Sequence, residues 1–411
     1  MRRAAGAVAA TLASVVLLAA CSGPPSQLGA HRVDDAVNLV DLTATSAMPA
    51  LPSDYLATGI VQFDSQPAVS GNVFVSTLFP NSEVEGLNFI GLSAAGTRWQ
   101  IETNPSCVGF VLTRDGDREL IVILDSDATA EAGKLATRTV ATAFESESGA
   151  IAWGPVDVPG PARGSGLIFA DTPKGIVSDD VSPAVMLSAH NGTVSVAEDA
   201  TGASTIEYAS NGTGIIETAG LLTAVDTATG KVLWDEGTLS RPTDVGASKQ
   251  VSVADNVSQG DVVFLDWVDS AGNTVVSAHN VRTGAMLAEF SGHLTGPSII
   301  DESSENLAVS SFRPTDGATI LTAIDPDSGT LWEQVLESDT TPVSASDKVI
   351  YLRGGMGNVT ITWSDGHQQQ RPQERIPMAV LSNGTGLFPT GEPYEYILAR
   401  PRTNAIDAND R

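Results

Sequence analysis

The side chains that most often carry out catalysis or bind metals are sparse in this chain of 411 residues. No two histidines have the spacing of a His-x-x-x-His zinc pair, and no serine stands in a Gly-x-Ser-x-Gly turn. His190 and His279 both follow Ser-Ala and precede Asn, which favours a structural role at a strand end. We therefore predict no catalytic residue and no metal ligand among the five histidines, which are His31, His190, His279, His293 and His367.

Three pairs of aspartates could bind Ca²⁺, because carboxylate oxygens are its preferred ligands. They are Asp115-Gly-Asp117, Asp125-Ser-Asp127 and Asp325-Pro-Asp327. The same residues also form tight turns, since an Asp side chain accepts hydrogen bonds from backbone N–H groups two residues on. Asp115-Gly is typical of a hairpin turn, and Asp325 opens a turn that recurs along the chain. We predict turns and no metal site, with Ca²⁺ binding as the alternative.

Cys21 is the residue for which the flanking sequence predicts a covalent modification. Arg2 and Arg3 precede an apolar run over residues 4–17, and Leu18-Ala-Ala-Cys21 follows. This arrangement resembles the signal peptide and lipobox of bacterial lipoproteins. The resemblance implies removal of residues 1–20, acylation of Cys21 with palmitate or a similar chain, and attachment to the extracytoplasmic face of a membrane. Whether that membrane is the inner or the outer one stays open.

Residues 21–35 contain Ser-Gly-Pro-Pro-Ser-Gln and are predicted to be a flexible tether. Beyond the N-terminal run, no segment is long and apolar enough to span a bilayer. The formal net charge of −27 would repel nucleic acid and anionic lipid headgroups. Cys107 is the second of two cysteines, so acylation of Cys21 would leave no intrachain disulfide. We expect Cys107 to be a small buried hydrophobe rather than a reactive thiol.

One sequence motif recurs along the chain, and the fold that positions any site is built from its copies. Its copies span residues 141–153, 222–234, 276–288 and 321–332. In the second copy, alternating residues lead to Asp226, a turn closes at Gly230, and a strand pattern resumes and ends at Trp234. Each copy is therefore predicted to be a β-hairpin with an aromatic residue packed between neighbouring units. The predicted structural residues are Gly149, Trp153, Asp226, Gly230, Trp234, Gly284, Asp325, Gly329 and Trp332.

A chain of such hairpins predicts an all-β fold, a single β-propeller over residues 36–400 with a polar tail at 401–411. Weaker copies extend the turn glycines to positions 96, 149, 192, 230, 284, 329 and 366, which are 37–54 residues apart. Four-stranded blades need about 40–50 residues each, so seven turns predict about seven blades, with six or eight as alternatives. Closure of the ring should pair strands from both chain ends. Residues 55–63 and 72–79 could supply early strands of the first blade, and residues 376–388 and 395–399 are the candidates at the C-terminal end.

The repeat resembles that of quinoprotein-type propellers, which include pyrroloquinoline-quinone (PQQ) dehydrogenases and non-catalytic BamB-like lipoproteins. Asp226, Gly230 and Trp234 carry the match, and Ala288 departs from it where a Trp is expected. The resemblance implies a propeller. Catalytic members of the family also carry neighbouring cysteines, a calcium-bound carboxylate cluster and a Trp beneath the quinone. This chain has no neighbouring cysteines, so we predict no cofactor and no enzyme.

These features predict a lipid-anchored propeller at the cell envelope that binds another envelope protein and acts as a non-catalytic interaction scaffold. The scaffold role follows from the resemblance to BamB-like propellers, because repeats specify a fold and not a ligand. Two alternatives stay open. One is binding of a glycan or another small ligand, and the other is a PQQ-dependent dehydrogenase.

Overall fold

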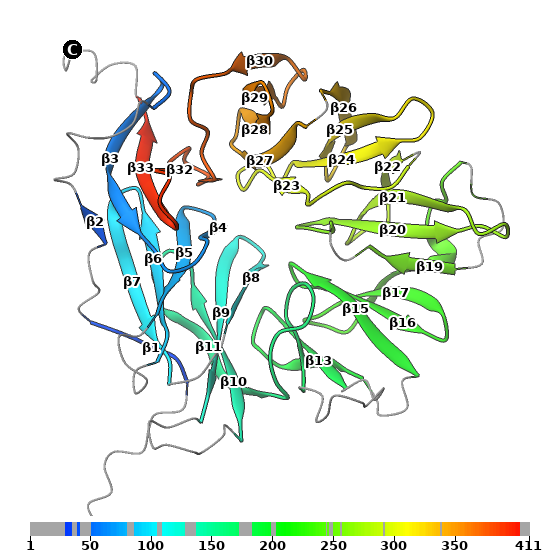
Figure 1. The fold of residues 1–411 in the computed structure, drawn as a ribbon. Helices are drawn as coiled ribbons and strands as arrows, with labels where there is room; N and C mark the ends of the chain where they lie inside the picture. Colours follow the sequence, from blue (N-terminus) through cyan, green and yellow to red (C-terminus); the bar gives the residue numbers. More distant parts are fainter. Residues whose placement is uncertain are drawn as a thin grey trace, which may run out of the picture.

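A computed structural model describes residues 29–34, 39–41, 51–79, 86–104, 109–127, 137–171, 183–198, 203–243, 245, 250–254, 257–290, 292–337 and 339–402. Eight antiparallel sheets form a ring around a central axis (Figure 1). We call the sheets blades 1 to 7 in chain order and the eighth the closing blade. Within this part of the chain the one helix is the short η2 (Glu236–Thr238), and no helix is long and apolar enough to cross a membrane.

In blades 1 to 7 the consecutive strands are ordered from the axis outwards along the chain. Blade 1 contains β4 (Ala68–Ser70), β5 (Val73–Leu78), β6 (Asn88–Ser93) and β7 (Gly96–Glu102), with β1 (His31–Arg32) added outside. Blade 2 contains β8 (Phe110–Asp115), β9 (Arg118–Ser126), β10 (Thr139–Glu145) and β11 (Ile151–Val158). Blade 3 contains β12 (Ile168–Ala170), β13 (Ala184–Leu187) and β14 (Val194–Ala197), and its inner edge is the bridge Ala162–Phe169. Blade 4 contains β15 (Ser204–Ser210), β16 (Thr213–Thr218), β17 (Leu221–Asp226) and β18 (Val232–Asp235).

The second half of the ring repeats the same plan. Blade 5 contains β19 (Gln250–Val253), β20 (Val262–Val268), β21 (Thr274–Asn280) and β22 (Met286–Phe290). Blade 6 contains β23 (Ile299–Ile300), β24 (Leu307–Arg313), β25 (Ala318–Asp325) and β26 (Gly329–Leu336). Blade 7 contains β27 (Thr341–Ala345), β28 (Val349–Gly354), β29 (Gly357–Thr362) and β30 (Gln368–Arg371).

The closing blade is built from both chain ends. It contains β31 (Ala379–Val380), β32 (Gly386–Pro389), β33 (Glu395–Pro401), β3 (Tyr55–Gln62) and β2 (Val40–Asp41), and β3 and β33 lie side by side in Figure 1. The β-propeller prediction is confirmed, but the expected seven blades are corrected to eight. The closing blade escaped the count because its last two long strands, β33 and β3, are not consecutive. No turn joins them, so no turn glycine marks this blade in the sequence.

The repeat tryptophans share one register position. Trp153 lies opposite Ala143, Trp234 opposite Ala224, and the same pairing recurs for Trp332 with Ala323 and Trp99 with Gly91. Ala288 lies opposite Ala278, which is the position that a Trp fills in the other copies. A small partner is needed because the indole covers it. A Cβ on Gly91, for example, would lie only 2.1 Å from Trp99 Cε2.

Each of these tryptophans joins its own blade to the next. Trp153 Nε1 donates to Ala189 O at 2.8 Å and Trp234 Nε1 donates to Val281 O at 2.7 Å, in both cases across a blade boundary. The core follows the same boundaries. One buried cluster joins Tyr208 and Leu222 of blade 4 to Val263 and Trp267 of blade 5. Burial of apolar surface between blades, rather than at one centre, therefore holds the ring together.

The ring has two faces, which the hairpins distinguish. In blades 1 to 7 the turns between the first two strands and between the last two strands emerge on one side of the ring, which we call the turn face. Links between blades and the turn between the two middle strands emerge on the other side, the link face. Gly29 lies near the link face, because its N–H donates to the carboxylate of Asp125 at the end of β9. β1 pairs with β7, and nearer the turn face the N–H of Leu39 donates to Thr97 Oγ1 of the same strand.

Candidate functional site

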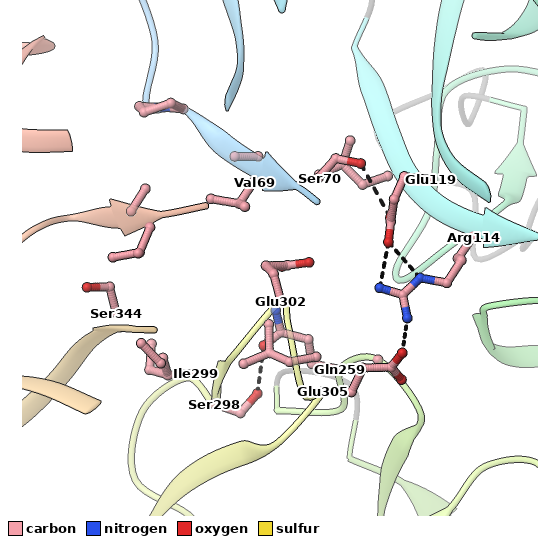
Figure 2. A pocket seen from close by; sticks show the side chains of 18 of the residues that line it. Val69, Ser70, Arg114, Glu119, Gln259, Ser298, Ile299, Glu302, Glu305 and Ser344 are labelled. Carbon is pink, nitrogen blue, oxygen red and sulfur yellow. Dashed lines mark hydrogen bonds and ion pairs between the residues drawn. The ribbon is translucent and has the colours of Figure 1, made fainter. Parts of the chain in front are cut away.

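The central channel is the cavity that the inner strands enclose. About 360 Å³ is lined by β4, β8, β23, β27, β31 and the end of β15 (Figure 2). Side chains such as Val69, Leu112 and Ile299 make much of its wall apolar. Polar side chains gather near Ser70, where the channel opens toward the turn face. The channel thus offers one apolar end and one charged end.

Arg114 on β8 bridges two carboxylates across the channel. One guanidinium nitrogen, Nη2, lies 2.6 Å from Glu119 Oε1 on β9, and another forms an ion pair with Glu305 of blade 6. Burial opposes the charge of Arg114, but Glu119 and Glu305 more than compensate and raise its pKa. Ser70 Oγ lies 3.5 Å from Glu119 Oε2, so Glu119 is also in contact with blade 1.

Glu302 is the carboxylate in this cluster that Arg114 does not neutralise. Figure 2 shows its side chain pointing into the cavity between Ser70 and Gln259. Among the residues that the structure describes, its carboxylate accepts no hydrogen bond and forms no ion pair. Although the channel leaves it partly accessible, protein surrounds it, and this burial, reinforced by Glu119, raises the pKa of Glu302 to about 8. The cluster is therefore short of positive charge.

A tight turn between β23 and β24 holds Glu302 and Glu305. Asp301 is buried, and its carboxylate accepts hydrogen bonds from both the N–H and the Oγ of Ser303 and of Ser304. Glu305 N donates to Asp301 O at 2.8 Å, as Gly230 N does to Asp226 O in a repeat turn. Glu305 thus occupies the glycine position of that turn, with φ at +61°. A side chain there is strained, and strained residues of this kind concentrate at functional sites.

The turn-face mouth of the channel is strongly acidic. Two further cavities of about 560 and 310 Å³ share Glu119 and Glu302 with the central one. The other carboxylates that line them are Asp117, Glu145, Glu147, Asp261 and Glu305. Arg118 and Arg282 also line this mouth, but Arg118 pairs with Asp115 at 2.5 Å, and Arg282 donates to Asn211 O. A cation entering from this face would meet an excess of negative charge.

The three aspartate pairs lie in different places. Asp125 anchors Gly29 and Asn104, and burial raises its pKa, whereas Asp127 accepts from the N–H of Thr137. Asp325 accepts from the N–H groups of the next turn residues, Asp327 and Ser328, so this pair closes a repeat turn. Within the described ranges, no group of three or more His, Cys, Asp or Glu residues is arranged to hold a metal ion.

The two histidines in matching sequence contexts have different surroundings. His279 is buried, and its Nε2 lies 2.8 Å from Ser277 Oγ, which accepts from Trp267 Nε1. His279 Nδ1 lies 3.0 Å from Gly284 O, and burial lowers the pKa of this histidine. Each polar atom of this group therefore faces a partner inside blade 5. His190 lies on the surface, with Nδ1 3.1 Å from Asp115 Oδ2.

The structure separates the predicted repeat residues from the channel cluster. Gly149, Trp153, Trp234 and Trp332 lie at the blade boundaries and Asp226, Gly230, Gly284, Asp325 and Gly329 in the turns of the outer strands. Cys21 and Cys107 lie outside the described residues. Arg114, Glu119, Glu302 and Glu305 were missed by the sequence reasoning. The available signal was Asp301-Glu-Ser-Ser-Glu305, a repeat-like turn with Glu in place of Gly.

No family model and no curated protein matches the chain. Several solved structures do. BamB from Moraxella catarrhalis is 14% identical, over 84% of this chain and 99% of that one, with a TM-score of 0.39. The computationally designed Ika8 protein is 11% identical, over 83% and 98%, with a TM-score of 0.40. The WD40 domain of Toxoplasma gondii coronin is 9% identical, over 92% and 87%, with a TM-score of 0.34. The propeller assignment itself rests on the strand pairing described above.

Proposed function

We propose that this protein is a lipid-anchored, extracytoplasmic β-propeller that binds an envelope protein at its turn face and acts as a non-catalytic interaction scaffold. The observation that carries the proposal is the acidic mouth of the channel, where Glu302 has no ion-pair partner among the described residues. Complementary charge speeds docking and excludes wrong partners. A partner with a basic surface is therefore the best match for this face.

The course of the N-terminal segment supports the same orientation. Gly29 lies near the link face, and Cys21 is eight residues earlier in the chain. Eight extended residues span at most about 28 Å. An acyl chain on Cys21 would hold the link face toward the membrane and leave the turn face directed away from it. A partner would then approach the acidic mouth without competing with lipid headgroups.

Site-specific photo-crosslinking in the native envelope tests this proposal. A photoreactive residue at Glu147 or Asp327 samples the exposed turn face, and one at Thr315 or Met356 samples the exposed link face. We expect one discrete protein adduct from the turn-face positions and none of that mass from the link-face positions. Crosslinking of the same partner from all four positions, or from none, would contradict a docking role for the turn face.

A further inference from the structure

Charge balance around Glu302 points to a missing positive group. Glu119, Glu302 and Glu305 converge on the channel, and Arg114 is the guanidinium that pairs with two of them. The third carboxylate, that of Glu302, is enclosed by protein and directed into the cavity with no partner among the residues described. A partly buried carboxylate without an ion-pair partner is destabilising, so a ligand that supplies positive charge would be bound favourably.

The neighbouring wall indicates the shape of that ligand. Val69, Ile299 and Ile300 line the cavity beside Glu302, and Ser298 and Gln259 add oxygen atoms to its floor. An apolar stem with a compact cationic tip matches this arrangement, since lysine buries its methylene groups and keeps its ammonium on polar atoms. An ammonium can direct its three donors to acceptors that are not coplanar, whereas a guanidinium favours planar, paired acceptors.

We propose that the channel mouth is a binding site for a primary alkylammonium group, contributed by a lysine side chain of the partner, with Glu302 as its ion-pair acceptor. This inference rests on the proposed function for the source of the ammonium group. The lysine enters from the turn face through the opening lined by Asp117 and Glu147, and its ammonium reaches the carboxylate of Glu302. The inserted lysine side chain fixes the position of the partner on the turn face.

Binding of the ammonium group at Glu302 is coupled to release of a proton from its carboxyl group. The groups that face Glu302 are Glu119 and Arg114 from blade 2 and Asp301 and Glu305 from its own turn. Burial and the surrounding carboxylates raise the pKa of Glu302 to about 8, so the empty site holds a proton at pH 7. The ammonium stabilises the ionised carboxylate and displaces that proton. Binding therefore strengthens as the pH rises from 6 to 8, while lysine itself remains charged because its pKa is about 10.4.

Calorimetric titration of the whole purified protein tests the site. The ligand is the peptide acetyl-Gly-Lys-Gly-amide, the neutral control is the same peptide with acetyl-lysine, and n-pentylammonium is the free amine. Two variants are compared, Glu302→Gln in the channel and Glu337→Gln at an exposed position between β26 and β27. Thermal melts establish that both variants are folded before the titrations begin.

We expect the lysine peptide to bind the wild type and Glu337→Gln equally, with release of close to one proton at pH 7. Glu302→Gln should weaken binding by roughly tenfold or more and abolish proton release, and the acetyl-lysine peptide should not bind. Equal affinity in Glu302→Gln, or equal binding of the acetyl-lysine peptide, would overturn the inference. Binding of n-pentylammonium without the lysine peptide would overturn a lysine as the source.

The two proposals can fail separately. If turn-face crosslinks persist at wild-type yield in Glu302→Gln and the lysine peptide does not bind, the scaffold stands and the ammonium site is wrong. If the lysine peptide binds in a Glu302-dependent way but no position crosslinks a partner, the site stands and partner docking at the turn face is wrong.

Discussion

The indole ring of Trp153 lies directly against Gly192 of the next blade. A Cβ placed on Gly192 would be 2.4 Å from Trp153 Cε3, and Trp153 Nε1 donates to Ala189 O at 2.8 Å. The same contact recurs between Trp234 and Gly284, where the added Cβ would be 3.0 Å from Trp234 Cγ. The turn glycine thus serves two purposes: it permits a positive φ and it leaves room for the preceding blade.

Gly192 and Gly230 separate these two purposes. Their φ angles are +73° and +70°, but a Cβ on Gly230 meets nothing within 4 Å. Gly230→Ala should lower the free energy of unfolding by about 1–2 kcal/mol, because alanine is strained in the left-handed conformation. Gly192→Ala should cost a further 1–3 kcal/mol because the Trp153 ring must move. Denaturant unfolding of both variants measures the difference, and equal losses would show that the ring contact contributes nothing.

Trp234→Ala should lower the free energy of unfolding by roughly 3–5 kcal/mol, because a buried indole and its hydrogen bond to Val281 are lost. Trp332→Ala should cost less, since Trp332 is only partly buried. Chemical denaturation followed by far-ultraviolet circular dichroism provides both values. A Trp234→Ala midpoint equal to that of the wild type would rule out a wedge between blades 4 and 5.

Glu302→Gln should change how stability depends on pH. The pKa of Glu302 is about 8 in the folded protein, and an unfolded glutamate has a pKa of about 4.3. Between these values the folded state holds a proton that the unfolded state has lost, so Glu302 makes the wild type less stable as the pH rises. The variant should therefore match the wild type at pH 4 and exceed it increasingly up to pH 8.

The measurement is the difference in unfolding free energy between wild type and Glu302→Gln across that pH range, with Glu337→Gln as the control. A difference for Glu302→Gln that varies with pH no more than the difference for Glu337→Gln would show that the pKa of Glu302 is not raised.

Arg114→Met should destabilise the ring by about 1–3 kcal/mol at pH 7, because Glu119 and Glu305 lose their shared counter-charge in a partly buried site. Arg313→Met is a matched control, since Arg313 pairs with Asp316 on the exposed surface. If Arg114→Met and Arg313→Met lower the free energy of unfolding by the same small amount, the ion pairs in the channel stabilise the ring no more than an exposed ion pair does.

Cys21→Ala tests the proposed anchor. The variant should move from the membrane fraction to the soluble extracytoplasmic fraction or accumulate with its signal peptide uncleaved. Intact-mass analysis of the wild type should show a chain that begins at Cys21 and carries acyl groups. Cleavage at another position without added acyl mass would refute lipidation.

The sequence predicts the hairpins that repeat along the chain. It does not predict the contacts between residues that are distant in sequence and meet only in the folded ring. The turn at Asp226–Gly230 and the vacancy at Ala288 are visible because local spacing encodes hairpins. The ion pair between Arg114 and Glu305 joins residues 191 positions apart, and no local pattern reports such a contact. The sequence does predict that strands from both chain ends close the ring, but the blade that they form was not counted because no turn joins β33 to β3.

The pairing of β3 with β33 sets the order in which this protein can finish folding. Thr58 Oγ1 donates to Leu398 O, a contact that spans 340 residues of sequence. Contacts of such high sequence separation form late, because the chain entropy of closing the loop must be overcome first. Until β33 has been synthesised, β3 therefore has an unpaired edge. An unpaired edge invites aggregation, so a chain cut before β33 should be cleared by proteases rather than accumulate as a shorter propeller.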